Sequence, residues 1–292
     1  MSCWLLLPLL TSVVSIAGTW TVAMEKEQGG GTSWIALSNR WQLGEGANGI
    51  LLWYGLALAN GHVCPLYNWM YNHSCSPDAS VRCCSIQNMP FVSTSGMNLP
   101  ENSLYSAVLN AVSVLFALVC IFRHAQIVER KVDEALLSKA AMIIGFFGSI
   151  GGFIAGNCNP SVLMVLHYFG ATLCFVSGCI YTILQTALTF RLHLTGKECF
   201  LAPLRALLAI FQVVFSICYL AFFVHPDTKK QHIGAICEWI LATNFYIFIM
   251  SFSFEFYYIT STVLYALISR PDDEKIAILS EPRGTNMATF DK

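Results

Sequence analysis

Long apolar runs alternate with short charged hinges along this chain after residue 103. A bilayer core about 30 Å thick is crossed by about 20 apolar helical residues, and backbone polar groups in lipid must be paired within their own segment. Each run of this length is therefore expected to be a transmembrane helix. Five runs fit, with a sixth candidate near the N-terminus: Leu104–Phe122, Ala140–Ala155, Val162–Leu188, Leu204–Val224 and Ile233–Phe254, and then Trp4–Val22.

The composition supports this interpretation. Hydrophobic residues make up 55% of the 292 residues and charged residues only 11%, which is too few to coat a soluble globule of this length. The predicted fold class is an all-α membrane protein, a six-span transmembrane helical bundle. The lipid bilayer is the one partner that the residues themselves indicate.

The distribution of basic residues predicts the orientation. Cytosolic loops are enriched in Lys and Arg, and these residues concentrate in two hinges and the C-terminal tail. Both termini are therefore expected in the cytosol and residues 23–103 outside. The basic residues on the predicted cytosolic side are Arg123, Arg130, Lys131, Lys139, Arg191, Lys197 and Arg205 in the hinges, and Arg270, Lys275, Arg283 and Lys292 in the tail.

The N-terminal region allows more than one interpretation. Residues 1–22 are expected to form the first span; the alternative, a signal peptide, is weakened because no Lys or Arg precedes the apolar run. Residues 23–53 are polar and glycine-rich, and removing them joins Val22 to Tyr54 in one apolar run, which favours an insertion. The alternative is a genuine outside loop before a short interfacial segment, Gly49–Ala59. The remaining divisions are 54–103, the rest of the first span with the outside loop; 104–268, spans two to six; and 269–292, a disordered cytosolic tail.

The outside loop carries Cys64, Cys75, Cys83 and Cys84 close together. Cysteines on the oxidising side of a membrane form disulfides, and four of them allow three connectivities. Adjacent cysteines seldom bond each other, so Cys64 and Cys75 are the expected partners of the other two. A zinc site is the alternative, but the paired C-x-x-C spacing is missing. Asn72-His73-Ser74 is an N-glycosylation acceptor sequence.

Two spans carry small or polar residues at helical spacing. Gly148, Gly152 and Gly156 form one smooth face of the third span, which suits close helix packing. This face is expected to meet a face of the fourth span, which is either a packing surface or a lipid or ion path lined by His167. That second face consists of His167, Gly170, Ala171, Cys174, Gly178, Tyr181 and Gln185.

Charged residues within spans need partners because their insertion into lipid costs about 2.5–3.5 kcal/mol each. Arg205 opens the fifth span at the level of Glu255, so we expect these two side chains to pair. Glu238 lies near the outer end of the sixth span, where the expected partners are His225, Lys229, Lys230 or His232.

No catalytic motif is recognisable in the sequence. A phosphate loop, a dinucleotide fingerprint and a nucleophile elbow are all missing, and no Asp lies within a span. We therefore predict a non-enzyme without catalytic residues, cofactor or metal. Nucleic-acid binding has no basic patch to support it.

Several strings in order along the chain resemble one family. They are Ile16–Trp20, Val63–Cys75 followed by Cys83-Cys84, Gly156-Asn157, Leu166–Ala171, Phe223–His225, Cys237–Trp239 and Ser253–Phe256. Together they resemble the transmembrane protein 150 family, A-type, within the damage-regulated autophagy modulators. The chain departs from that family where Ser95 and Ser103 stand in place of two cysteines, a joint loss that is expected if the two normally bond each other.

The resemblance implies a regulator rather than a catalyst. A-type members look like plasma-membrane proteins that help to place the phosphatidylinositol 4-kinase complex and so tune phosphatidylinositol 4-phosphate synthesis. Adaptors of that kinase are the implied partners, contacting the hinges Arg123–Lys139 and Arg191–Arg205 and the tail. The alternatives are an autophagy modulator of endosomal or lysosomal membranes, an ion or lipid channel or transporter, and a surface receptor acting through the outside loop. The sequence indicates no oligomeric state.

Overall fold

The computed structural model describes residues 8, 52–75, 83–130, 132–192, 196–257 and 259. Apart from Pro8, the predicted first span lies outside the described residues, as do most of the predicted insertion and the whole of the tail 269–292. Within the described residues the chain is helical and contains no β-strand, only an isolated bridge between Tyr71 and Cys84.

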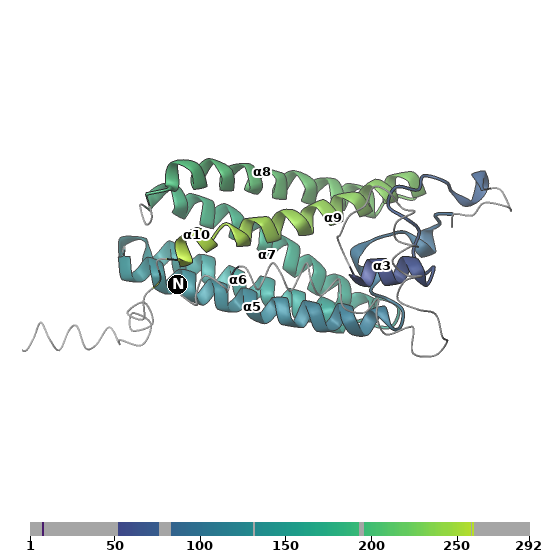
Figure 1. Ribbon diagram of the computed structural model, residues 1–292, viewed down its shortest axis with the longest axis horizontal. Coiled ribbons are helices and arrows are strands. Elements are labelled where there is room, and N and C mark those ends of the chain that lie inside the picture. The colour runs from purple at the N-terminus through teal and green to yellow at the C-terminus, as the bar shows by residue number, and fades with distance from the viewer. Residues whose placement is uncertain are drawn as a thin grey trace, which may run out of the picture.

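Five long helices lie side by side and form the body of the molecule (Figure 1). Each is long and apolar enough to cross a membrane, so the expectation of an all-α multi-span membrane protein is confirmed. Their bounds are α5, Glu101–Arg130; α6, Ala135–Asn157; α7, Met164–Arg191; α8, Glu198–Phe223; and α9, Thr228–Met250, which is followed by the short α10, Ser253–Phe256.

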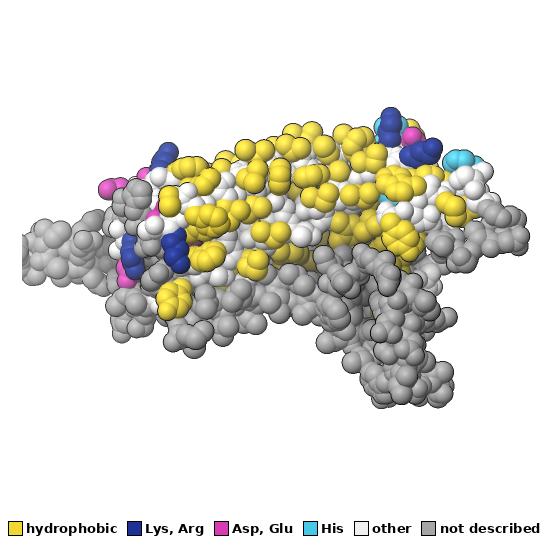
Figure 2. Space-filling view, turned by 45° about the horizontal axis from the view of Figure 1, so that its top comes forward, with side chains coloured by type: hydrophobic (Ala, Val, Ile, Leu, Met, Phe, Trp, Pro, Cys, Tyr) yellow, Lys and Arg dark blue, Asp and Glu magenta, His cyan; other side chains and the backbone are white. Residues whose placement is uncertain are grey.

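The surface matches a bilayer. In Figure 2 hydrophobic side chains cover the middle of the visible face, while Lys, Arg, Asp, Glu and His side chains lie at its two ends. We call the end where α5 begins and residues 52–75 and 83–100 lie the disulfide end, and the end where α5 stops and α10 lies the hinge end (Figure 1). The apolar belt between them is the part that lipid would surround.

One sequence boundary was wrong. The predicted second span stops at Phe122, which left Arg123 in a cytosolic hinge, but α5 continues to Arg130 and Arg123 is fully buried within it. The hinge itself is short: the 3₁₀ turn η5, Val132–Glu134, leads directly into α6.

Among the described residues, four short elements gather at the disulfide end. The helix α3, Leu52–Ala59, packs on the start of α5, with the rings of Trp53 and Tyr105 5.7 Å apart. The other short elements here are the 3₁₀ turns η3, Asn72–Ser74, and η4, Ile86–Asn88, and the helix α4, Val92–Ser95. Two disulfides tie this region together, Cys64–Cys84 and Cys75–Cys83, so Cys64 and Cys75 are the partners of the adjacent cysteines, as expected.

The glycines of α6 lie against two different helices. A Cβ atom on Gly151 would come within 2.5 Å of the Cys174 backbone nitrogen, so this residue sets the close approach of α6 to α7. On the predicted face, Gly148 and Gly152 lie between α5 and α7, since a Cβ on Gly152 would be 2.8 Å from Ser113 Oγ and 3.7 Å from Cys174 Sγ. Gly156 faces only Leu109 of α5. Two of the three glycines therefore meet the fourth span as expected, whereas Gly156 meets α5 instead.

Candidate functional site

A buried ionic cluster lies at the hinge end, formed by Arg123 of α5, Arg205 of α8 and Glu255 of α10. Arg205 Nη2 and Nη1 donate to the two carboxylate oxygens of Glu255 at 2.5 and 3.0 Å. Arg123 Nη2 lies 3.0 Å from Glu255 Oε1. The two guanidinium groups and the carboxylate are buried, so one negative charge is shared between two positive charges inside the protein.

Neutral polar groups complete the cluster. Arg123 donates from Nη1 to Gln126 Oε1 at 3.0 Å and from Nε to Gln185 Oε1 at 3.3 Å. Arg205 donates to Thr189 Oγ1 at 2.7 Å and to Ser251 Oγ at 2.9 Å. These bonds matter because buried ions are tolerated only where their remaining donors and lone pairs are satisfied.

An aromatic ring lies beneath both arginines. The guanidinium carbon of Arg205 lies 4.3 Å from the ring centroid of Phe252, and that of Arg123 lies 5.2 Å away. A cation over an aromatic face is attracted by the negative face of the ring. The cluster thus joins α5, α7, α8 and the α9–α10 segment at one level of the bundle.

The structure contains the pair that we expected between Arg205 and Glu255, and adds Arg123, which sequence reasoning missed. The spacing of Arg123 relative to neighbouring apolar residues could have indicated that it is buried. Phe116, Cys120, Arg123 and Ile127 recur every three or four positions and all are buried, so Arg123 lies on the inward face of α5.

A second set of buried polar groups lies at the disulfide end, and here the expectation for Glu238 was wrong. Glu238 Oε2 accepts from the backbone N–H of Val92 at 2.8 Å, and none of its four expected partners pairs with it within the described residues. The next residue, Trp239, donates from Nε1 to Pro90 O at 2.9 Å. These two residues of α9 therefore hold the segment that leads into α4.

The histidine of α9 holds the preceding part of the same loop. His232 Nε2 lies 2.8 Å from Leu66 O, and its ring stacks on Trp69 with centroids 4.4 Å apart. The hydroxyl of Tyr71 lies 3.4 Å from His232 Nδ1, and burial raises the pKa of this phenol, which keeps it neutral. The loop segments Leu66–Tyr71 and Pro90–Val92 are thus fastened to α9 by backbone and ring contacts.

A buried carboxylate at the start of α5 was also missed. Glu101 is fully buried and its Oε1 accepts from Asn60 Nδ2 at 2.6 Å, with His62 Nδ1 at 3.1 Å from the same oxygen. It binds the end of α3 to the start of α5. Because Glu101 precedes the apolar run of the second span, the sequence did not indicate that its side chain would be buried.

The contacts of His167 are local. Its Nδ1 lies 3.0 Å from Ala155 O and 2.8 Å from Cys158 O, so it donates to the carbonyl groups that end α6. Gln185, on the same predicted face, bonds Arg123. These contacts are those of a packing surface that fixes the turn between α6 and α7, and they give no support to a path lined by His167.

Comparisons with known proteins assign the chain to a family. The sequence profile of the Frag1/DRAM/Sfk1/Cwh43P N-terminal domain matches residues 47–259, which include every helix from α3 to α10, both disulfides and the ionic cluster. The chain belongs to the Frag1/DRAM/Sfk1/Cwh43P family. No solved structure matches the chain.

Relatives within this family share most of their length with the chain. Mouse (Mus musculus) Transmembrane protein 150A is 31% identical over 273 residues, which cover 92% of this chain and 89% of the relative. Xenopus laevis "Modulator of macroautophagy TMEM150B-A" is 28% identical, covering 72% of this chain and 81% of the relative. Rat (Rattus norvegicus) "DNA damage-regulated autophagy modulator protein 2" is 26% identical, covering 60% and 74%. The resemblance found in the sequence is confirmed, and the family is one of membrane regulators.

The ionic cluster holds its helical segments together. Each ionisable group of the cluster is bonded to another member, so none is left as a nucleophile or base. The described residues also contain no group of three or more His, Cys, Asp or Glu side chains that could hold a metal ion.

Proposed function

We propose that this chain is a non-catalytic multi-pass regulator that helps to place a phosphatidylinositol 4-kinase complex at the cytosolic face of the plasma membrane. The observation that carries the proposal is the Arg123–Glu255–Arg205 cluster, which fixes four helical segments to one another at the hinge end. A scaffold needs such a fixed surface, because a partner loses less affinity when the groups that it binds are already ordered.

The charge of the hinge end favours the cytosolic side. Arg130, Lys139, Arg191 and Lys197 lie in or beside the connections at this end. Basic residues near the anionic cytosolic leaflet contribute about 1 kcal/mol each to surface attraction. We propose this orientation, with both termini in the cytosol and the disulfide-bonded loop outside, which the positive-inside rule also predicts.

The similarity to Transmembrane protein 150A over nearly the whole chain supports the same class of function. A second candidate, modulation of autophagy at endosomal or lysosomal membranes, is favoured by the relatives named as a modulator of macroautophagy and as a DNA damage-regulated autophagy modulator. The two candidates differ in the membrane at which the chain acts and in the partners at its cytosolic face.

Proximity labelling from the C-terminus in living cells tests the proposal. A matched control carries the label on the outside loop, so that labelled cytosolic proteins can be assigned to the hinge end. Recovery of kinase subunits or adaptors only with the C-terminal label is the expected result. Recovery of autophagy proteins at endolysosomal membranes would favour the second candidate, and recovery of neither set would contradict both.

A further inference from the structure

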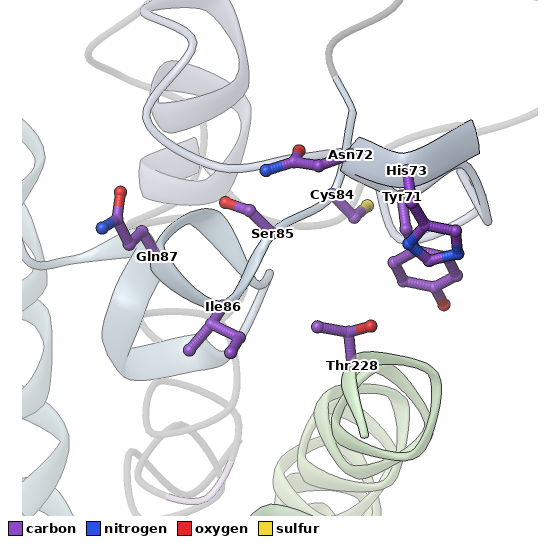
Figure 3. Close-up of a pocket in the computed structure, with 8 residues that line it drawn as sticks. All are labelled: Tyr71, Asn72, His73, Cys84, Ser85, Ile86, Gln87 and Thr228. Carbon is purple, nitrogen blue, oxygen red and sulfur yellow. The ribbon is translucent and has the colours of Figure 1, made fainter. Parts of the chain in front are cut away.

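A small cavity lies between the disulfide-bonded loop and the start of α9 (Figure 3). Its volume is about 320 Å³, and it is lined by Tyr71, Asn72, His73, Cys84, Ser85, Ile86, Gln87 and Thr228. Ligand sites start at about 300 Å³, so the space suits one small ring rather than a long chain. The lining carries amides, hydroxyl groups and rings but no carboxylate, Lys or Arg.

Asn72 is both a wall of this cavity and the acceptor of the only Asn-x-Ser/Thr sequence in the described loop. Its side chain is exposed and makes no hydrogen bond to the described residues, so the amide is available. In Figure 3 this amide extends along the side of the cavity that Ser85, Ile86 and Gln87 form. A group attached there would lie against those three side chains.

The wall next to Asn72 has the chemistry of a sugar-binding surface. Ile86 is 64% exposed, a large apolar side chain with nothing over it. Gln87 makes no side-chain hydrogen bond within the part of the chain that the structure describes. On the other side the rings of Tyr71 and His73 lie nearly parallel, 10° apart. Amide and hydroxyl groups beside apolar and aromatic surface can bond the hydroxyl and acetamide groups of a sugar while covering its C–H face.

We propose that Asn72 is N-glycosylated and that its first N-acetylglucosamine sits in this cavity, covering Ile86 and bonding Gln87, and so fastens the disulfide-bonded loop beside Thr228 of α9. The inference goes beyond the proposed function and needs only the outside placement of the loop. In the attachment step Asn72 Nδ2 bonds to C1 of the sugar of a lipid-linked oligosaccharide. The bond from C1 to the pyrophosphate oxygen breaks, the pyrophosphate keeps the electron pair, and the amide loses one proton.

Local structure explains how the site stays open. Ser74 Oγ donates to Tyr71 O at 3.0 Å and accepts from Tyr71 N at 3.1 Å, so the hydroxyl of the acceptor sequence fixes the turn η3. Asn88 fixes the wall formed by Ser85, Ile86 and Gln87, since its side chain accepts from Ser85 N at 2.6 Å and donates to Cys83 O at 2.9 Å. The two walls are thus preformed around the point of attachment.

The test compares three forms of the folded, full-length protein, made in cells whose glycans stay rich in mannose. One form is untreated, one is trimmed with endoglycosidase H, which leaves a single N-acetylglucosamine, and one is stripped with peptide N-glycosidase F. Hydrogen exchange of residues 71–75 and 84–88 is measured in each form. Because the enzymes act after folding, a variant that fails to fold cannot confuse the result.

We expect exchange in residues 84–88 to be several-fold slower in both the untreated and the trimmed forms than in the stripped form. The variant Gln87→Ala should keep the glycan and lose most of that protection, while Ser74→Thr, which preserves the acceptor sequence, should keep both. The proposal would be overturned if the chain showed the same electrophoretic mobility before and after glycosidase treatment, and the same mobility as the Asn72→Gln variant, because no glycan would then be attached. A glycosylated chain with equal exchange in all three forms would overturn it as well, since the sugar would then project into solvent.

Discussion

At the scale of single residues, the hinge-end cluster is asymmetric. Glu255 balances two arginines, whereas each arginine has the carboxylate and at least two neutral acceptors. Removing one partner of a buried ion pair costs about 3–5 kcal/mol because it strands an unpaired charge. The carboxylate is therefore the member on which the other two depend.

We expect Glu255→Gln to lower the stability of the purified protein by about 3–5 kcal/mol, since two buried arginines then face each other. Arg123→Gln should cost at most about half as much, because it leaves Arg205 and Glu255 as a neutral pair. Thermal unfolding in one detergent measures both variants. Equal losses for the two would show that Arg123 and Glu255 do not act as a charge-sharing set.

The sequence predicted the partner of a buried charge correctly where the position of the residue along its membrane span was enough to identify that partner. Arg205 and Glu255 lie at the same level of neighbouring spans, and the structure pairs them. The partner of Glu238 could not be found in this way, because it is a backbone N–H in a loop far away in sequence. The positions of charged residues in the sequence do not show which backbone N–H group will lie next to a buried carboxylate.

At the scale of elements, α6 and α7 are held close by small residues. A Cβ on Gly151 would meet the backbone at 2.5 Å from Cys174 N and 2.6 Å from Gly170 O, where no side-chain movement can relieve the contact. On Gly148 it would meet Phe116 and Ser177 at 3.5 Å, which is ordinary packing. The spacing in the sequence predicted close packing but not which neighbour each glycine meets, since that depends on the rotation of α6.

Gly151→Ala should therefore destabilise the bundle by about 1–3 kcal/mol, the usual penalty for overpacking. Gly148→Ala serves as the matched control and should change stability by far less. The measurement is again thermal unfolding of the purified proteins. A larger loss for Gly148→Ala would contradict the assignment of the α6–α7 contact to Gly151.

The two disulfides close loops of different length, with sequence separations of 20 for Cys64–Cys84 and 8 for Cys75–Cys83. A longer closed loop restricts the unfolded chain more, and a loop of about 15 residues is worth about 3 kcal/mol. The double variant Cys64→Ser, Cys84→Ser should therefore be destabilised by about 3 kcal/mol. The double variant Cys75→Ser, Cys83→Ser should lose less stability. Greater damage from losing Cys75–Cys83 would contradict this order.

At the scale of the whole molecule, α9 connects the two ends. Its first turns hold the disulfide-bonded loop through His232, Glu238 and Trp239, and its far end leads to Ser251 and Glu255 in the ionic cluster. The number and order of the later spans could be predicted because hydrophobic length is encoded locally. How the loop docks could not, because it depends on contacts between distant segments.

The account of the chain as a regulator is tested most directly by plasma-membrane phosphatidylinositol 4-phosphate itself. The measurement follows the return of a fluorescent sensor of this lipid to the plasma membrane after the lipid has been acutely depleted. Cells with the full chain are compared with cells that carry a chain ending at residue 259, at matched surface levels of the two chains. The account predicts that the full chain changes the rate of recovery and that the shortened chain, which keeps the hinge end but lacks the tail's part of the contact surface, changes it less. Recovery that is the same with the full chain, the shortened chain and no added chain would contradict it.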